Sequence, residues 1–399
     1  MSSFPASAGA GETLLHAPSA RRALVGLCLS GLLASLLGAI LPAWGYHLKF
    51  EFTTIGHYFL SVAVGVLFSV EAARRLLPRK GVAFVLILAC SLACGALVFL
   101  AFAPPPFPAL WRMGTLIVVG MALGLLNSAI FQAISTIYQH DPAATLNLGG
   151  IVFGLGCLLI TLVVAETFNA YSVTVILALV AIVPAAFVVL YAKTSFPPSV
   201  IPPQPSWRQA LADFRSLGAV SLALLLFFQF GNEWSIAGWL PIFLIHRLGV
   251  SPGAALNLLA VYWSALLLGR IGALVILRRV SHGRVLMGSA ASAMFGCMLL
   301  FSTNNQFGAT TGILLVGGGF ATIYPLVAEK IGHRFTYYHP GLFNGIFSLA
   351  MVGAMLAPWL LGYLAGIWGV GVVMVAPMIG TVMVFALVLL IWLEAKIGG

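Results

Sequence analysis

The chain has 399 residues, of which 61% are hydrophobic and only 7% are charged, and its formal net charge is +10. Soluble domains carry about 25% charged residues, so this composition excludes an ordinary soluble protein and indicates a polytopic membrane protein. The polar gaps between the apolar runs reach only roughly 20 residues, which is too short for a separate soluble core.

Twelve apolar runs of about membrane-spanning length, which is about 20 residues, follow one another along the chain. They lie at about 22–45, 56–73, 81–103, 112–138, 145–166, 170–192, 217–245, 254–278, 284–302, 307–329, 340–366 and 369–394. Because their number is even, both termini share one side of the membrane. All Lys and Arg residues except Lys49, Arg112 and Arg247 fall on that side. The positive-inside bias makes it the cytoplasm, so the charge sets orientation and does not indicate a nucleic-acid partner.

The runs divide into two sets of six around a hydrophilic stretch. We expect residues 1–20 to form a disordered cytoplasmic N-terminus and residues 21–193 an N-terminal six-helix bundle. Residues 194–215 are expected to form a cytoplasmic linker with a short amphipathic helix on the membrane surface. Residues 216–399 then form a C-terminal six-helix bundle.

The two halves repeat one another, with three pairs of matching motifs in the same order. The pairs are Gly65-x8-Arg74-Arg75-x4-Lys80 with Gly269-x8-Arg278-Arg279-x4-Arg284, Asn147-x8-Gly156 with Asn344-x8-Gly353, and Leu41-Pro42 with Leu240-Pro241. Features that recur in the same order indicate parallel repeats related by an axis along the membrane normal. The sequence therefore predicts an all-α membrane protein of twelve transmembrane helices in two six-helix parallel pseudo-repeats.

The seventh run, near residues 217–245, carries polar side chains at its centre. Gln229, Asn232 and Glu233 share one face of a helix (i, i+3, i+4). An acid at bilayer depth costs about 2.5–3.5 kcal/mol on insertion scales, so it faces a cavity or a partner rather than lipid. We predict the wall of a solute site, with Glu233 as the residue that couples transport to proton movement. The alternative is a neutral acid that is hydrogen-bonded inside the bundle.

Two amide side chains in the fourth run are further candidates for binding a solute. Asn127 lies near the middle of the run, close to Gly120, Gly124 and Ser128. It could donate to a solute, or it could hold helices together, as amides and small residues do in membranes. Gln132 lies about a turn deeper and is a weaker candidate for the same role.

Aromatic residues on the helices of the second half are candidates for stacking on the solute. They are Trp234, Trp239, Tyr262, Trp263 and Tyr324. An aromatic face can cover the apolar side of a sugar ring while its polar edge binds hydroxyls. Ordinary aromatic packing is the alternative, and it fits Tyr262 and Trp263 well because these two lie toward the outer side.

Gating is predicted at the cytoplasmic helix ends. Glu71 precedes Arg74 and Arg75 by one turn, which is the spacing of an ion-pair latch at a helix end. Asn147 and Asn344 occupy matching positions near the cytoplasmic starts of the fifth and eleventh helices. As a repeated pair they are expected to cap or gate rather than to bind solute.

The repeats, the cytoplasmic middle loop and the basic loops together resemble the major facilitator superfamily over nearly the whole chain. Gly269-Arg270…Arg278-Arg279…Arg284 resembles its loop motif, which implies gating roles for these four arginines. The first-half copy lacks the motif's Gly-x-Leu-Ala-Asp start.

Within the superfamily, Phe227-Phe228-Gln229-Phe230-Gly231-Asn232-Glu233 followed by Gly238-Trp239-Leu240 resembles the seventh helix of the fucose permease-like group of fucose–galactose–glucose:proton symporters. Gly120-x3-Gly124-x2-Asn127 is similar to the fourth helix of the same group. The fucose permease carries an acid in its first helix, and this chain has none between Glu12 and Glu51, so its coupling residue must lie elsewhere.

These features predict a secondary transporter of the cell (inner) membrane, which takes up a small polar solute such as a sugar together with a proton. Sodium stays an alternative coupling ion. The alternatives are an exporter or facilitator of an amphipathic compound and a non-transporting membrane sensor. The sequence carries no nucleotide-phosphate loop, metal constellation or nucleophile triad, so we expect no cofactor, metal, enzymatic activity or nucleic-acid partner. We expect a monomer.

Overall fold

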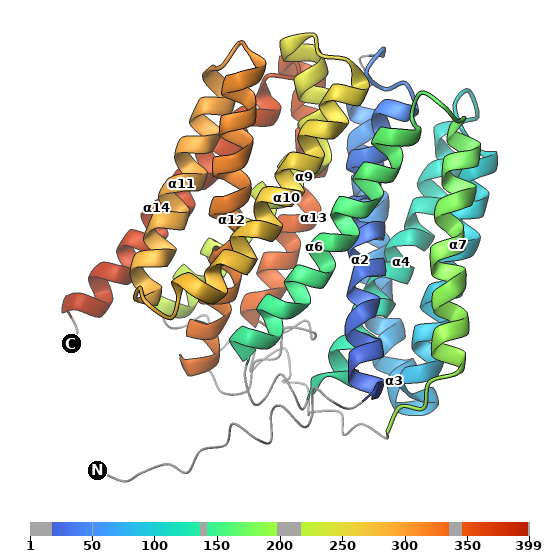
Figure 1. Cartoon of the computed structure of the whole chain (residues 1–399), viewed down its shortest axis with the longest axis horizontal. Coiled ribbons are helices and arrows are strands. Elements are labelled where there is room, and N and C mark those ends of the chain that lie inside the picture. The colour runs from blue at the N-terminus through green and yellow to red at the C-terminus, as the bar shows by residue number, and fades with distance from the viewer. Residues whose placement is uncertain (1–17, 50, 136–141, 198–216, 335–344, 398–399) are drawn as a thin grey trace.

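The computed structural model describes residues 18–49, 51–135, 142–197, 217–334 and 345–397, which are coloured in Figure 1. These residues form eleven helices, each long and apolar enough to cross a membrane. They are α2 (Pro18–Ala43), α3 (Phe52–Phe102), α4 (Ala109–Ala133), α6 (Pro142–Thr167), α7 (Val173–Ala192), α9 (Leu217–Leu248), α10 (Pro252–Ile276), α11 (His282–Ser302), α12 (Gln306–Arg334), α13 (Gly345–Trp368) and α14 (Val372–Ile397). The chain is therefore an all-helical membrane protein, as predicted.

Helix α3 unites the second and third predicted apolar runs into 51 residues. A straight helix of that length would measure about 75 Å, more than twice the roughly 30 Å of a bilayer core. The helix is broken at Gly81, whose φ of 80° and ψ of 173° are not helical. Glycine adopts a positive φ without the steric cost that a Cβ would add. The break falls where the sequence predicts a turn between two spans.

The helices gather in two groups that lie side by side in Figure 1. In one group, α3 packs against α4 and α7, and α2 packs against α6. In the other, α9 packs against α13 and α14, while α11 and α10 both pack against α12. The groups meet through three helix pairs, which are α2 with α9, α3 with α13 and α6 with α10. The site described below lies between these pairs.

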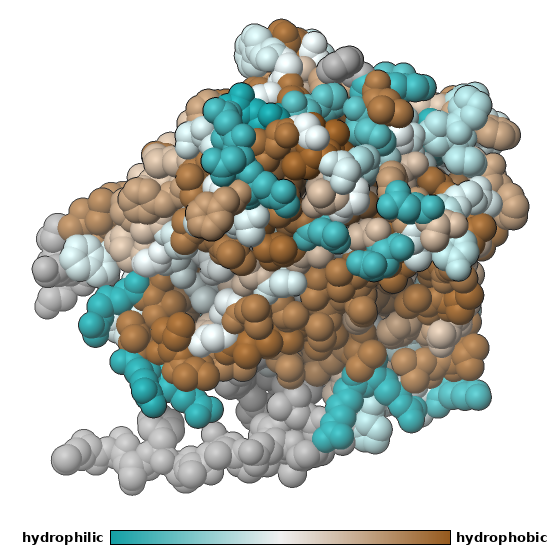
Figure 2. Space-filling model, turned by 45° about the horizontal axis from the view of Figure 1, so that its top comes forward, coloured by the Kyte–Doolittle hydropathy of each residue, from teal (hydrophilic) through white to brown (hydrophobic). Residues whose placement is uncertain are grey.

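The outer surface of the helices is apolar. Phe68, Ile182 and Leu268 are each more than half exposed. Figure 2 shows a hydrophobic band with hydrophilic side chains above and below it. A band of this kind suits contact with lipid tails, because the helices satisfy their backbone polar groups internally.

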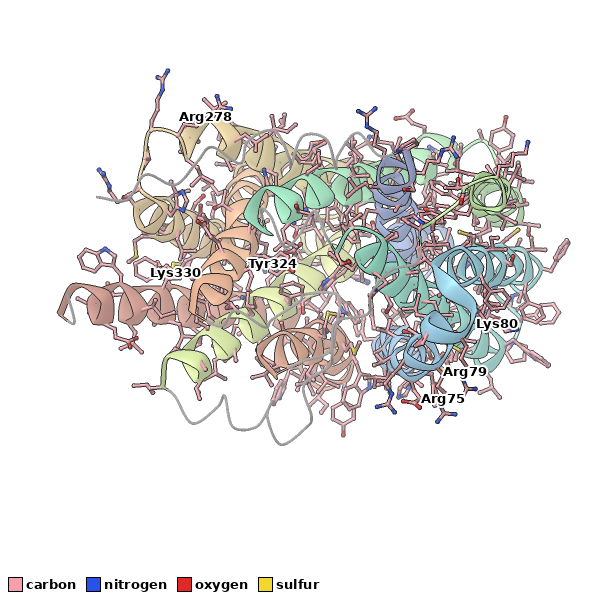
Figure 3. All side chains as sticks on the ribbon, turned by 90° about the horizontal axis from the view of Figure 1, so that it is seen from below. Arg75, Arg79, Lys80, Arg278, Tyr324 and Lys330 are labelled. Carbon is pink, nitrogen blue, oxygen red and sulfur yellow. The ribbon has the colours of Figure 1, made fainter. Side chains whose placement is uncertain are left out.

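Basic side chains lie at the edges of the end seen in Figure 3. Arg75, Arg79 and Lys80 project at one edge and Arg278 at the opposite edge, whereas Tyr324 lies toward the centre. This arrangement agrees with the one-sided distribution of charge in the sequence.

Arg112 is an exception to that distribution, and it is buried at the opposite end of the first group, with only 3% of its surface exposed. Its Nε donates to the Tyr58 hydroxyl at 2.8 Å, and its Nη1 donates to the carbonyl oxygens of Ala103 at 3.2 Å and Phe107 at 2.9 Å. Its Nη2 donates to the Tyr46 hydroxyl at 3.3 Å. The guanidinium is thus held by several acceptors, which offsets the cost of burying it. Its role is to tie α3, α4 and the loop after α2 together.

Helices α2 and α6 approach closely through a glycine on each. A Cβ at Gly156 would overlap the carbonyl oxygen of Cys28, and a Cβ at Gly31 would overlap that of Phe153. Small residues permit such close backbone contact, which drives helix association in membranes. This contact holds α6, one wall of the site, against α2.

We expect Gly156→Ala to destabilise the protein by about 1–3 kcal/mol, the usual cost of overpacking, because the obstacle is backbone that cannot move aside. Gly95→Ala is the matched control, since a Cβ there meets nothing within 4 Å. Thermal unfolding of the purified protein in detergent measures both. An unchanged melting temperature for Gly156→Ala would contradict the packing described here.

Candidate functional site

A cavity of about 300 Å³ lies between the two helix groups. Residues of α2, α3, α4 and α6 line it from one side, and residues of α9, α10, α12 and α13 line it from the other. Its size is at the lower end of small-molecule sites. The side chains on its wall that carry polar atoms are Ser35, Asn127, Ser128, Thr145, Glu233, Trp234, Arg270 and Tyr324.

Glu233 lies on the cavity wall, as the sequence predicts for a solute site. It is 7% exposed and comes from the middle of α9. Its backbone carbonyl oxygen accepts from the Tyr262 hydroxyl at 3.5 Å. Its carboxyl group interacts electrostatically with Arg270 of α10. Among the described residues, however, no basic nitrogen lies within 4.0 Å of the carboxyl oxygens.

Arg270 is the second charged residue on the wall, and only 6% of its surface is exposed. Its Nη1 donates to the carbonyl oxygen of Gly150 on α6. In return, Nδ2 of Asn147 on α6 donates to the carbonyl oxygen of Arg270 at 3.3 Å. These two bonds join α6 and α10, which belong to different helix groups. The buried Nε of Arg270 has no hydrogen-bond partner among the described residues.

Asn127 reaches the same cavity from α4. Its Oδ1 accepts from the Ser30 hydroxyl of α2 at 2.7 Å. This bond fixes the orientation of the amide, so that its NH₂ group serves as the donor on the wall.

Aromatic side chains complete the wall on the second helix group. Trp234 packs edge-to-face on Phe153 of α6, with ring centroids 6.0 Å apart. Tyr324 of α12 packs edge-to-face on Phe230, with centroids 5.0 Å apart. Both pairs line the cavity, so they could stack on an apolar face of a solute.

Comparison with known proteins gives a consistent result, although no family model matches the chain. The chain is 23% identical over 319 residues to an uncharacterised MFS-type transporter of Yersinia pestis, covering 78% of this chain and 80% of that protein. It is 26% identical over 356 residues to a glucose/galactose transporter of Brucella abortus, covering 82% and 81%. A D-xylose–proton symporter structure matches with a TM-score of 0.73, at 16% identity over 94% of this chain and 96% of that one. The major facilitator superfamily transporter FucP, in its outward conformation, matches with a TM-score of 0.63, at 14% identity over 94% and 98%.

The chain has the major facilitator fold. These matches confirm the resemblance predicted from the sequence, including its fucose permease-like group. The proteins matched are transporters by name and not enzymes, which supports the prediction of a transporter.

Several predicted solute-binding residues lie away from the cavity wall of this major facilitator fold. Trp239 is fully buried, and its Nε1 donates to the carbonyl oxygen of Pro358 on α13 at 3.0 Å. Tyr262 and Trp263 stack on each other, and Trp263 lies behind Trp234. These aromatic residues therefore take the packing alternative. Gln132 of α4 is buried and is not part of the wall.

The other two polar residues of the seventh-run motif also lie off the wall. The side chain of Asn232 lies against Gly380 of α14, and its Nδ2 has no hydrogen-bond partner among the described residues. Gln229 is fully buried one turn before Glu233, and neither of its amide atoms meets hydrogen-bond geometry with a described residue. Neighbouring residues on a helix point about 100° apart, so Asn232 faces α14 while Glu233 faces the cavity.

The residues predicted to gate lie in two places. Glu71 pairs with Arg74 and Arg75 on the exposed end of α3, at the predicted spacing. Three arginines of the second-half motif are exposed around the turn between α10 and α11, and Nε of the last donates to the Ser281 hydroxyl at 2.9 Å. They are Arg278, Arg279 and Arg284. Arg270 and Asn147 instead join α6 to α10, and Asn344 lies outside the described residues. Gating by these residues stays a prediction.

Sequence reasoning did not place several wall residues in the site. Among them are Ser35, Thr145, Phe153, Met351 and Met355. Small hydroxyl and apolar side chains are common throughout membrane helices, so none carries a signal of its own. Arg270 did carry one, because a cation inside an apolar run faces a cavity or a partner by default. The loop-motif resemblance drew attention away from that reading.

We expect Trp239→Phe to lower the free energy of unfolding by about 1 kcal/mol, because one buried hydrogen bond is lost, while solute flux in vesicles is retained. Trp234→Phe is the matched variant on the wall, and it should weaken solute uptake with little effect on the melting temperature. If Trp239→Phe abolished flux without lowering the melting temperature, the assignment of Trp239 to packing would be wrong.

Proposed function

We propose that this chain is a secondary transporter of the cell (inner) membrane, with both termini in the cytoplasm. It takes up a small polar solute such as a sugar, together with a proton, by alternating access. The observation that carries this proposal is the cavity between the two helix groups, with Glu233 on its wall. The names of the matched proteins, which include a glucose/galactose transporter and a xylose–proton symporter, support a sugar and a proton.

We further propose twelve spans in two parallel six-helix bundles, at residues 21–193 and 216–399, joined by a linker at 194–215. The break at Gly81 divides α3 into two spans, and with the other ten helices this makes twelve. The two-group arrangement in Figure 1 supports this division.

Contacts between the helix groups at opposite ends of the cavity suit alternating access. Toward one end, Gly38 of α2 packs on the backbone of Ala237 in α9, and Gly56 of α3 packs on Gly362 of α13. Toward the other end, the hydrogen bonds of Arg270 join α10 to α6. Rocking of one bundle against the other would open one set of contacts while it keeps the other.

In this proposal, the solute is held by wall residues from both bundles. Asn127 donates from the first bundle, and Trp234 and Tyr324 stack from the second. Glu233 takes up the proton when the cavity faces one compartment and releases it when the cavity faces the other. Asn232, Gln229, Gln132, Trp239, Tyr262 and Trp263 are not part of the proposed solute contact, because they lie off the wall.

A specific observation favours one other function, which is facilitation or export of an amphipathic compound. Much of the cavity wall is apolar and includes Phe59, Phe131, Met351 and Met355. Flexible methionine and aromatic surfaces adapt to varied apolar ligands. Efflux, rather than uptake, of such a compound from vesicles would favour this function.

We expect Glu233→Gln to abolish accumulation of solute against its gradient in reconstituted vesicles with an imposed pH gradient. The amide keeps the shape of the side chain and cannot titrate, so downhill exchange of solute should continue. Wild-type vesicles should lose accumulation when a protonophore is added, and they should keep it when choline replaces sodium.

Glu166→Gln is the matched control, because Glu166 is exposed at the end of α6, outside the cavity wall. It should accumulate solute like the wild type. Undiminished accumulation by Glu233→Gln would refute proton coupling at this residue, and dependence on sodium would replace the proton as the coupling ion.

A further inference from the structure

The cavity presents two opposite charges that do not touch. Glu233 of α9 and Arg270 of α10 both line it and interact electrostatically. Yet among the described residues, the only ion pairs within 4.0 Å lie elsewhere, at Lys49–Glu51, Glu71 with its two arginines, and His282–Glu329. An acid and a guanidinium at this depth would normally form a direct pair. A separation between them leaves room for a ligand group.

Arg270 has donors to spare. A guanidinium carries five N–H groups in a planar fork that matches a carboxylate. In the described part of the chain, only Nη1 makes a hydrogen bond, and the buried Nε has none. Arg112, in the same protein, is equally buried, but its guanidinium makes four hydrogen bonds. The contrast indicates that Arg270 is kept available for a partner that is absent from the chain itself.

We propose that the solute is a hydroxylated carboxylate, such as a sugar acid, whose carboxylate binds Arg270 while Glu233 carries the proton. This inference rests on the proposed function and names its substrate class. In the empty cavity, the Glu233 carboxylate balances the Arg270 cation. When the solute enters, a proton from the bulk binds Glu233, and the solute carboxylate replaces it as the counter-ion of Arg270. The charge in the cavity is zero in both states, so neither state carries an uncompensated charge across the low-dielectric interior.

The rest of the wall fits the other parts of such a molecule. Asn127, Ser128 and Thr145 offer hydrogen bonds to hydroxyl groups, and Trp234 and Tyr324 offer faces for a ring. A neutral sugar would leave Arg270 as an unpaired buried cation whenever Glu233 is protonated. An unpaired buried charge is strongly unfavourable, and this cost favours the acid over the neutral sugar.

The remaining titratable groups near Glu233 do not compete for its role. Tyr262 of α10 and Cys157 of α6 interact with it electrostatically, and Tyr324 of α12 shares its cavity. Tyrosine and cysteine are ordinarily neutral below about pH 7.5. The described residues of α2, α13 and α14 add no acid or base to the cavity wall. Binding of a carboxylate should therefore tighten as the pH falls from 7.5 to 5.5 and protonates Glu233.

The test uses three solutes with the same ring and different charge, which are D-glucuronate, D-glucose and D-glucosamine. Each is offered to the full-length protein in vesicles and, by thermal shift, to the protein in detergent at pH 5.5 and 7.5. We expect D-glucuronate to be taken up and to stabilise the protein more at pH 5.5. Preference for D-glucose or D-glucosamine would overturn the inference and leave the proposed function standing. Absence of flux for all three would overturn both.

Two variants separate the charge of Arg270 from its contact with Gly150. Arg270→Gln keeps a hydrogen-bond donor and removes the charge, so it should weaken D-glucuronate binding by about tenfold or more and abolish its pH dependence. Arg270→Lys keeps the charge and loses the planar fork, and it should retain the preference for D-glucuronate over D-glucose. If Arg270→Gln folds with an unchanged melting temperature and binds D-glucuronate as the wild type does, the carboxylate lies elsewhere and the inference is wrong. If Arg270→Gln does not fold, loss of the preference in Arg270→Lys decides against the guanidinium in the same way.

Discussion

The structure depends on two opposite charges placed inside an apolar helix bundle without a direct bond between them. Helix α9 supplies the acid and helix α10 supplies the guanidinium, and both lie on one cavity wall. Burying either charge is costly, and their mutual attraction is realised in full only at short range. A bundle that keeps them apart therefore holds a site whose stability changes with whatever enters between them. A proton, a solute or both can relieve this cost, and that is the physical basis on which a cavity of this kind can respond to its ligands.

The helix contacts around the cavity explain how this separation is maintained. Arg270 is drawn toward α6 by the carbonyl oxygen of Gly150, and Asn147 holds the backbone of α10 in return. Glycine at position 150 is required, because a Cβ there would press against the guanidinium. The same two bonds cross between the helix groups. The position of the cation is thereby linked to the distance between the groups, so a change in its partner can be felt as a change in the packing of α6 on α10.

Much of the fold could be predicted from the sequence because hydrophobic length and the one-sided placement of Lys and Arg are strong signals. The site was less accessible. Glu233 could be predicted because an acid at bilayer depth has few explanations. Asn232 and Trp239 could not be placed, since their orientation depends on which neighbour α9 meets at each turn. Asn232 meets Gly380 of α14, and Trp239 meets Pro358 of α13. No pattern within one helix encodes the partner across the interface.

Two buried arginines show how structure adds what sequence lacks. Arg112 and Arg270 both interrupt apolar runs and are almost equally buried, so burial and residue type do not distinguish them. Their hydrogen bonds do. Arg112 is enclosed by the hydroxyls of Tyr46 and Tyr58 and by two backbone carbonyls, which leaves little for a ligand to bind. Arg270 makes one bond from its guanidinium within the described chain and faces a cavity with an acid in it. A buried cation whose donors are satisfied stabilises a fold, whereas one whose donors are left open beside a cavity is arranged to receive an anion.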